Sequence, residues 1–322
     1  MSVSDVNIKR RKGKLEKNYY GYLFTAPFII GFLVFSFYPL IYTFYLSITN
    51  TTLMSETSKI VGLDNFKQLF EDKFFMQSLK NTWKIWLLNF IPQIGIAMLL
   101  SIWFTNNRLK MKGVGIFRAI YYLPNLLMPA TIAVLFFNFF SMYGPVNQLF
   151  SQAIDYFRST GWTQGIVIFV QWWMWFGSTL IVLMAGMTSI SPSYYESATV
   201  DGATAAQMFT KITLPLLKPI LVYTLVTSLV GGMQMFDIPY MLTDGRGSPS
   251  GSIMTMSILM YMKFSSTKGH IGAAASVGVV MFIITCVCAF AIVRLLRDKD
   301  STGTGVSSKV KSRELKKGAA GV

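Results

Sequence analysis

Long apolar stretches constrain this chain more than any other feature of its sequence. Segments of about 20 mostly apolar residues recur along it, and each can cross the ~30 Å hydrocarbon core of a bilayer as a helix. Of the 322 residues, 52% are hydrophobic and only 13% are charged, whereas soluble domains carry about 25% charged residues. The sequence therefore predicts an all-α membrane protein that crosses the bilayer several times.

The hydropathy pattern predicts six transmembrane helices within one transmembrane domain, residues 19–297. The first apolar block is too long for a cleavable signal peptide and is expected to remain as a membrane anchor. Basic tails are expected at 1–18 and 298–322, the second disordered because it is rich in Gly, Ser and charge. The spans run approximately over residues 20–48, 79–104, 119–142, 164–187, 220–240 and 271–296.

The positive charges indicate how the chain is oriented. With six spans, both tails and the loops 105–118 and 191–219 share one side, and 20 of the 29 Lys and Arg residues fall there or at its margins. Only eight fall in the loops of the other side. Because cytoplasmic loops carry the excess of Lys and Arg, we expect both termini in the cytoplasm. This segregation explains the net charge of +15 without a nucleic-acid partner, and the expected surroundings are the lipid bilayer.

The polar segment 191–219, SPSYYESATVDGATAAQMFTKITLPLLKP, lies between the fourth and fifth spans. Ser193 and Glu196 have the spacing of a capping box, and Pro192 suits the first turn of a helix. Small residues follow, and Gly202 interrupts them. We expect two short helices joined at this glycine, with a small-residue surface suited to docking into a cleft on another protein.

The second of these short helices is expected to end at Leu214-Pro215. Proline has no amide to donate and disfavours the helical conformation in the residue before it. The fifth span would then begin as a separate helix.

No residue pattern typical of an enzyme active site occurs in the chain. It has no Gly-x-x-x-x-Gly-Lys-Ser/Thr sequence, and Gly303-Thr304-Gly305 lies in the tail without a strand and helix around it. The single histidine, His270, and the two cysteines, Cys286 and Cys288 on different sides of an apolar helix, predict neither a metal site nor a disulfide. The chain is expected to be no enzyme and to bind no metal or cofactor itself.

Two ionisable residues, Lys84 and Asp237, are expected within spans, where charges are costly and often functional. The long stem of Lys84 can carry its ammonium group to the outer interface, which is the structural alternative to a function. Asp237, near the outer end of the fifth span, has three open roles. It can line a pathway, pair with a partner subunit or face the outer water.

The fourth and fifth spans carry candidate residues of a substrate pathway. Trp175 and Ser178 share one face of the fourth helix, with Trp172 a turn further outward. Aromatic rings beside small polar groups suit a sugar, although a tryptophan belt at the interface is the alternative. On the fifth helix, residues at helical spacing give one face that lines a cavity or forms a close helix contact: Ser228, Gly232 and Met235.

The segment 191–219 resembles the EAA loop of the permease subunits of ABC importers. The matching pattern is Glu196-Ser197-Ala198-x-x-Asp201-Gly202-Ala203 followed by Ile212-x-Leu214-Pro215, with Ser197 where the family has its middle Ala. Further motifs occur in the order seen in the carbohydrate branch, which includes the larger maltose-transporter permease and the glycerol-3-phosphate importer permease. They are Gly62-Leu63-Asp64-Asn65-Phe66, Asn81-Thr82, Leu123-Pro124, Gly144-Pro145-Val146-Asn147, Phe236-Asp237 and Leu242-Thr243.

The resemblance covers about residues 20–297 and implies a MetI-like fold in a bacterial cell membrane. It implies a permease subunit for an oligosaccharide or related polyol, with three kinds of partner: a second homologous permease, an ATPase dimer that holds ATP and Mg, and an extracytoplasmic solute-binding protein. It implies sugar contacts at the fourth- and fifth-span residues named above. It also implies coupling to the ATPase, with Glu196 forming a salt bridge, through Glu196, Ser197, Ala198, Asp201, Gly202 and Ala203.

Three alternatives remain open from the sequence. An ABC permease for another solute, such as a polyol phosphate or an amino acid, would work by the same mechanics. A secondary transporter would need no ATPase and predicts an inverted repeat with intramembrane acidic groups. A signalling or scaffold membrane protein gives no reason for the small-residue segment 191–219.

Overall fold

A computed structural model describes residues 19–55, 58–106, 111–151, 153–243 and 245–296, so the two predicted tails lie outside the described residues. The described chain is helical, as predicted, with two isolated β-bridges. The longer helices are α1 (Tyr19–Phe32), α2 (Tyr38–Ser47), α4 (Lys73–Thr105), α5 (Val114–Leu126), α6 (Pro129–Phe139), α8 (Thr160–Thr188), α11 (Leu214–Met233) and α14 (Ile271–Leu296). The shorter helices are α3 (Asp64–Glu71), α7 (Pro145–Leu149), α9 (Pro192–Val200), α10 (Ala205–Met208), α12 (Asp237–Met241) and α13 (Met256–Phe264).

Five stretches of helix are long and apolar enough to cross a membrane, and the bent pair α5 and α6 would make a sixth span. The five stretches are Tyr22–Ser47, Lys73–Thr105, Thr160–Thr188, Ala205–Met241 and Ile271–Leu296. The expectation of an all-helical protein with several spans is thus confirmed, and the number of spans is five or six.

The third predicted span, 119–142, is not one straight helix. α5 ends at Leu126, α6 begins at Pro129, and the two axes differ by 93°. The residues between them are extended, and Pro129 favours this conformation in the residue before it because its ring crowds a helical backbone there. The hydropathy pattern did not reveal this break, since both halves are apolar.

The fifth span begins earlier than predicted and is continuous with α10. Leu214-Pro215 does not end a helix, because a wide π-helical turn, Phe209–Thr213, joins α10 directly to α11. Proline is tolerated in the first turn of α11, where its missing amide is not needed. At the other end α11 stops at Met233, and Asp237 begins the short helix α12, which belongs to the same apolar stretch, Ala205–Met241.

Residues 66–79, between the first and second long apolar stretches, are divided between α3 and α4. Asp72 between them is extended and caps α4, since its carboxylate accepts a hydrogen bond from the Phe74 amide at 2.9 Å. The same carboxylate forms a half-buried ion pair of 2.8 Å with Lys263 at the end of α13. The start of α4 is therefore fixed to the segment that precedes α14.

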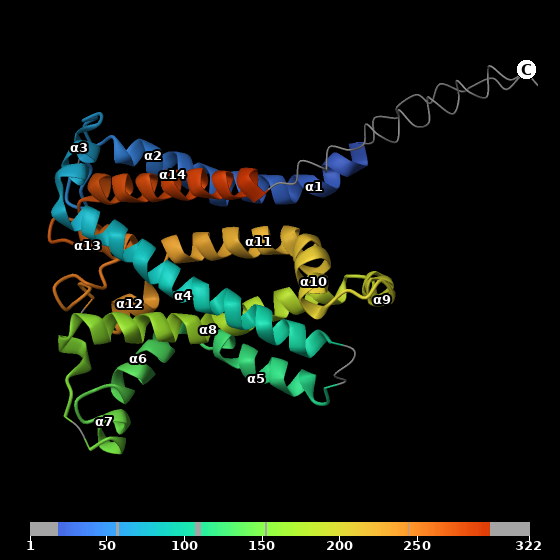
Figure 1. The fold of residues 1–322 in the computed structure, drawn as a ribbon. Coiled ribbons are helices and arrows are strands. Elements are labelled where there is room, and N and C mark those ends of the chain that lie inside the picture. The colour runs from blue at the N-terminus through green and yellow to red at the C-terminus, as the bar shows by residue number, and fades with distance from the viewer. Residues whose placement is uncertain (1–18, 56–57, 107–110, 152, 244, 297–322) are drawn as a thin grey trace, which may run out of the picture.

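The helices are arranged around a core formed by α4, α8 and α11 (Figure 1). α4 packs along α8, and α5 packs against α8 and the end of α4, where the Phe104 and Phe117 rings stack. α2 and α14 form a second layer, in which the Phe44 and Phe282 rings meet edge to face. α9 and α10 lie at the end of the molecule where α1 starts and α14 ends, whereas α3, α7, α12 and α13 lie at the opposite end (Figure 1).

The loop between α12 and α13 is held by side chains of α4 and α8. The Asn81 amide donates to the carbonyl groups of Gly251 and Met254, and the Gln164 amide donates to Ser252. The Lys84 ammonium group donates to the Gln164 carbonyl at 2.6 Å, so this lysine supports the same network. These bonds fix the chain that follows α12 at one end of the core.

Candidate functional site

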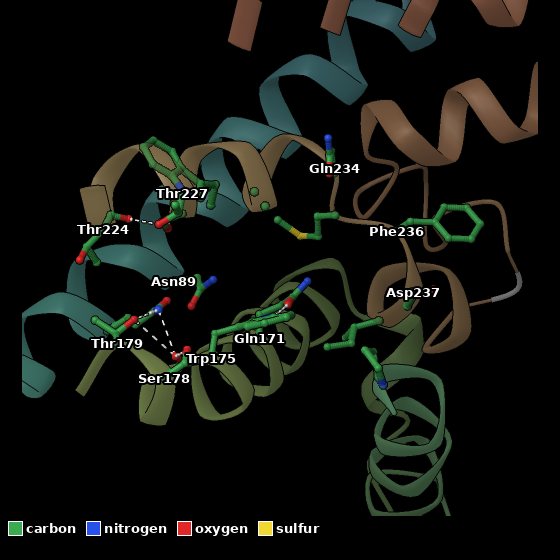
Figure 2. A pocket seen from close by; sticks show the side chains of 18 of the residues that line it. Asn89, Gln171, Trp175, Ser178, Thr179, Thr224, Thr227, Gln234, Phe236 and Asp237 are labelled. Carbon is green, nitrogen blue, oxygen red and sulfur yellow. Dashed lines mark hydrogen bonds between the residues drawn. The ribbon is translucent and has the colours of Figure 1, made fainter. Parts of the chain in front are cut away.

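A cavity of about 380 Å³ lies between α4, α8 and α11 and is closed at one end by residues around the start of α12 (Figure 2). Its wall is formed by amides, hydroxyl groups and aromatic rings. The residues from α4 and α8 are Trp86, Asn89, Gln93, Gln171, Trp175, Ser178, Thr179 and Val182. The others are Pro129, Tyr223, Thr224, Thr227, Ser228, Gly231, Gly232, Gln234, Met235, Phe236, Asp237 and Ile238.

Hydrogen bonds between α4 and α8 position the amides on one side of the cavity. The Gln93 amide donates to the Thr179 hydroxyl at 2.7 Å and to the Trp175 carbonyl. The Trp175 indole N–H in turn donates to the Gln171 carbonyl oxygen at 3.2 Å, one helical turn away. Because Gln93, Gln171 and Thr179 are buried, these bonds also satisfy polar groups that water reaches poorly.

On the opposite side, Gly232 of α11 lies against the ring of Trp86. A Cβ atom added to Gly232 would lie 2.1 Å from the Trp86 Cδ1 atom, so only glycine lets the indole pack there. The Trp86 N–H donates to the Ser228 hydroxyl at 3.1 Å. Trp86 stacks on Phe90 with a ring separation of 5.6 Å, which completes this wall.

The structure brings together most of the pathway residues predicted from sequence. Six of them line the cavity, namely Trp175, Ser178, Ser228, Gly232, Met235 and Asp237. Trp172 does not line it, because its ring packs between Phe169 and Phe176 on another face of α8.

Sequence reasoning missed the contribution of α4. Trp86, Asn89 and Gln93 recur at spacings of three and four residues and so share one helix face, a polar stripe within an apolar span. That periodicity was available in the sequence. Intramembrane amides facing the bundle interior are the signal that would have identified these residues.

In the segment 191–219, the short helix α9 is joined to α10 at Gly202, as predicted, although α10 continues into α11 and does not end as a separate short helix. Gly202 has φ +72°, a conformation that glycine adopts without steric cost. The amides of Gly202 and Ala203 donate to the carbonyl groups of Thr199 and Ala198, which is the Schellman arrangement that ends a helix. The turn between α9 and α10 is therefore fixed by its own backbone.

The predicted capping box at Ser193 and Glu196 does not form. α9 has Pro192 in its first turn, as expected, but its cap residue is Ser191 and makes no side-chain capping bond. A capping box occurs instead at the start of α10, where Thr204 and Gln207 bond reciprocally. The Ser193 spacing was misleading because the helix begins before that residue.

The predicted coupling residues lie around the exposed tip of this segment. Glu196, Ser197, Asp201 and Gly202 are exposed, whereas Ala198 and Ala203 are half-buried. Val200, which sequence reasoning did not single out, is 88% exposed at the end of α9. The base is held in place by a 2.9 Å hydrogen bond between the Tyr195 and Thr213 hydroxyl groups.

Comparison with known proteins identifies the family. The family model described as the binding-protein-dependent transport system inner membrane component matches residues 82–299. The chain belongs to this family. It is 31% identical to the lactose transport system permease protein LacF of Rhizobium radiobacter, over 85% of this chain and 94% of LacF. It is 30% identical to the arabinooligosaccharides transport system permease protein AraP of Bacillus subtilis (strain 168), over 85% of this chain and 87% of AraP.

Two solved structures share the fold of this inner membrane component. Both are of a bacterial ABC transporter for the acidic polysaccharide alginate, and one includes an alginate pentasaccharide-bound periplasmic protein. Each has a TM-score of 0.73 with this chain, at 25% and 26% identity. The aligned regions cover 87% of this chain and 94% and 95% of theirs. The MetI-like permease fold expected from the sequence is thereby confirmed.

Because the chain belongs to this family, several predictions made from the sequence are confirmed. The chain is a multi-pass protein of the bacterial inner membrane and a permease component of an ABC uptake system. It is not itself the ATPase, because a separate subunit hydrolyses ATP, and it binds no cofactor of its own. The secondary-transporter and scaffold alternatives do not agree with this family.

Proposed function

We propose that this chain is the membrane-spanning subunit of an ATP-driven importer of carbohydrate, an oligosaccharide or related polyol. The observation that carries the proposal is the cavity between α4, α8 and α11, with the rings of Trp86 and Trp175 beside amides and hydroxyl groups. An aromatic face receives the C–H surface of a sugar ring, and neighbouring polar groups bond its hydroxyls. The names of the relatives, lactose and arabinooligosaccharide permeases, support the same class of substrate.

The continuous helix from α10 to α11 provides a physical route for coupling. It starts at the exposed turn after Gly202, passes through the π-helical turn and ends in the cavity wall at Gly232. A movement of the turn would therefore shift Thr224, Thr227 and Ser228 relative to α4 and α8. We assign ATPase contact to Glu196, Ser197, Asp201 and Gly202, with Ala198 and Ala203 allowing close packing.

The proposed orientation places this turn and both termini in the cytoplasm, where ATP is available. The arrangement of the helices supports this orientation, since the start of α1 and the end of α14 lie toward the same end of the molecule as α9 and α10 (Figure 1). The excess of Lys and Arg in the tails and in the loops 105–118 and 191–219 favours the cytoplasm for that end. The domain plan proposed is thus a permease domain, 19–297, between tails at 1–18 and 298–322.

The proposed assembly contains a second homologous permease, an ATPase dimer below and an extracytoplasmic solute-binding protein above. Closure of the ATPase dimer on ATP would draw the two coupling turns together and reorient the bundle from inward-open to outward-open. The exposed carboxylate of Glu196 would form a salt bridge with the ATPase.

The proposal is tested by Glu196→Lys in the complete transporter reconstituted in proteoliposomes. ATP-dependent sugar uptake should fall at least about tenfold, because the reversed charge costs more than about 1.4 kcal/mol of coupling at a close contact. Membrane insertion should be unchanged. Glu71→Lys, an exposed glutamate of α3 at the opposite end, is the matched control and should retain uptake. Full uptake by Glu196→Lys would rule out the coupling role.

A further inference from the structure

Several hydroxyl groups that line the cavity offer their oxygen lone pairs to a ligand. The Ser178, Thr224 and Thr227 hydroxyls each donate to a carbonyl group of their own helix, at 2.8 Å. Their hydrogen atoms are thus occupied, and the lone pairs of these oxygens remain for another group. The two indole N–H groups of the cavity, from Trp86 and Trp175, also donate to protein oxygens.

A buried acceptor without a partner adds to this pattern. Asn89 is 7% exposed and lines the cavity, and its Oδ1 atom has no hydrogen-bond partner among the described residues. Leaving a buried acceptor without a hydrogen bond is unfavourable, because the group has lost its contacts with water. A ligand that donates a hydrogen bond at this end of the cavity would remove that cost. Figure 2 shows the Asn89 amide between α8 and the side chains of α11.

The one charged side chain among the described residues that line the cavity is the exposed Asp237. Asp237 lies at its edge (Figure 2), and its carboxylate makes no ion pair with any described residue. No Lys, Arg or His is among the described residues that line the cavity. An ionised ligand carboxylate or phosphate is held best by a cation, and at this cavity it would meet the Asp237 carboxylate instead.

We infer that the cavity selects uncharged, hydroxyl-rich saccharides and excludes uronates and sugar phosphates. This inference rests on the proposed carbohydrate function and adds the substrate class to it. Hydroxyl groups of a neutral sugar donate to Asn89, Asp237 and the Ser and Thr oxygens, while its C–H faces contact Trp86 and Trp175.

The test uses the complete transporter with its own binding protein in proteoliposomes and two labelled pools of equal concentration. One pool holds neutral di- and trisaccharides, including lactose and arabinooligosaccharides, and the other holds uronate oligosaccharides prepared from alginate. ATP-dependent uptake of the neutral pool should exceed that of the uronate pool by about tenfold or more, since like charges at close contact cost several kcal/mol.

Variants of Asp237 show how much of the selectivity comes from the permease, because the binding protein is the same in every experiment. Asp237→Asn keeps the side-chain shape and Asp237→Arg reverses the charge, so the neutral-to-uronate uptake ratio should fall in that order. Asp155→Asn removes a carboxylate on the loop before α8, outside the cavity, and should leave the ratio unchanged. A ratio that does not respond to either Asp237 variant would overturn the inference.

The outcomes distinguish the inference from the proposed function. Uptake of the uronate pool with exclusion of the neutral pool would overturn the inference but leave the carbohydrate function in place. Uptake of neither pool by a complex that hydrolyses ATP would overturn the carbohydrate function itself.

Discussion

At the scale of single residues, Gly232 shows how one missing side chain positions a binding wall. The indole of Trp86 occupies the space that any Cβ atom at this position would take. Its N–H then reaches the Ser228 hydroxyl one turn earlier on α11. The small face of the fifth span, for which the sequence left two roles open, therefore serves both. It is a close helix contact and a wall of the cavity.

Gly232→Ala should destabilise the transporter and lower sugar uptake. The added methyl group forces the Trp86 ring out of its packed position, and overpacking of this kind costs about 1–3 kcal/mol. The melting temperature of the purified complex measures the effect on stability. Gly231→Ala is the matched control for stability, because a Cβ atom there meets no atom within 4 Å. Equal melting temperatures for the two variants would contradict the packing role of Gly232.

At the scale of elements, the π-helical turn and the Schellman turn define the coupling segment. The first joins α10 to α11 without a break, and the second fixes the angle between α9 and α10. Because of these two turns, α9, α10 and α11 form a continuous structure that leads from Glu196 to the cavity wall.

Gly202→Ala should weaken coupling more than it weakens the fold. A left-handed backbone costs an L-residue about 1–2 kcal/mol, and this turn is exposed, so the strain acts locally on α9 and α10. We expect sugar-stimulated ATP hydrolysis to fall severalfold, with little change in membrane insertion. Gly161→Ala in α8, where φ is helical and the space is open, should keep normal stimulation. Normal stimulation in Gly202→Ala would show that the turn does not require glycine.

The sequence predicts a helix well where a long apolar run requires one. It does not predict where local backbone geometry bends, continues or ends that helix. The four helices α2, α4, α8 and α14 were found because long apolar runs leave few alternatives. The 93° break before Pro129, the continuation through Pro215 and the end of α11 at Met233 were missed. In each case apolar residues continue past the position, and local proline geometry or tertiary hydrogen bonding determines the path of the backbone.

At the scale of the whole molecule, the segment 191–219 and both ends of the membrane domain share one end, and the clamped loop before α13 lies at the other (Figure 1). The cavity lies between these ends, and residues around the start of α12 contribute to its wall. The site was partly predictable from sequence. Residues on α8 and α11 were identified because they share a helix face, whereas the polar stripe of α4 was overlooked although its spacing is present in the sequence.

The proposed orientation predicts the side from which two engineered cysteines react. In a chain with Cys286 and Cys288 replaced by Ser, Ser197→Cys should react with a membrane-impermeant maleimide only from the cytoplasmic side. Lys268→Cys, in the exposed turn before α14, should react only from the opposite side. Reaction of both cysteines from one side would contradict the orientation.

The most direct test of the central claim is to tag the chain, extract it in mild detergent and identify the copurifying proteins. An ATPase with a phosphate-binding loop and a second permease with its own EAA segment should be recovered, and sugar with the binding protein should stimulate ATP hydrolysis by this complex. Recovery of the chain alone, active in uptake without ATP, would contradict the account.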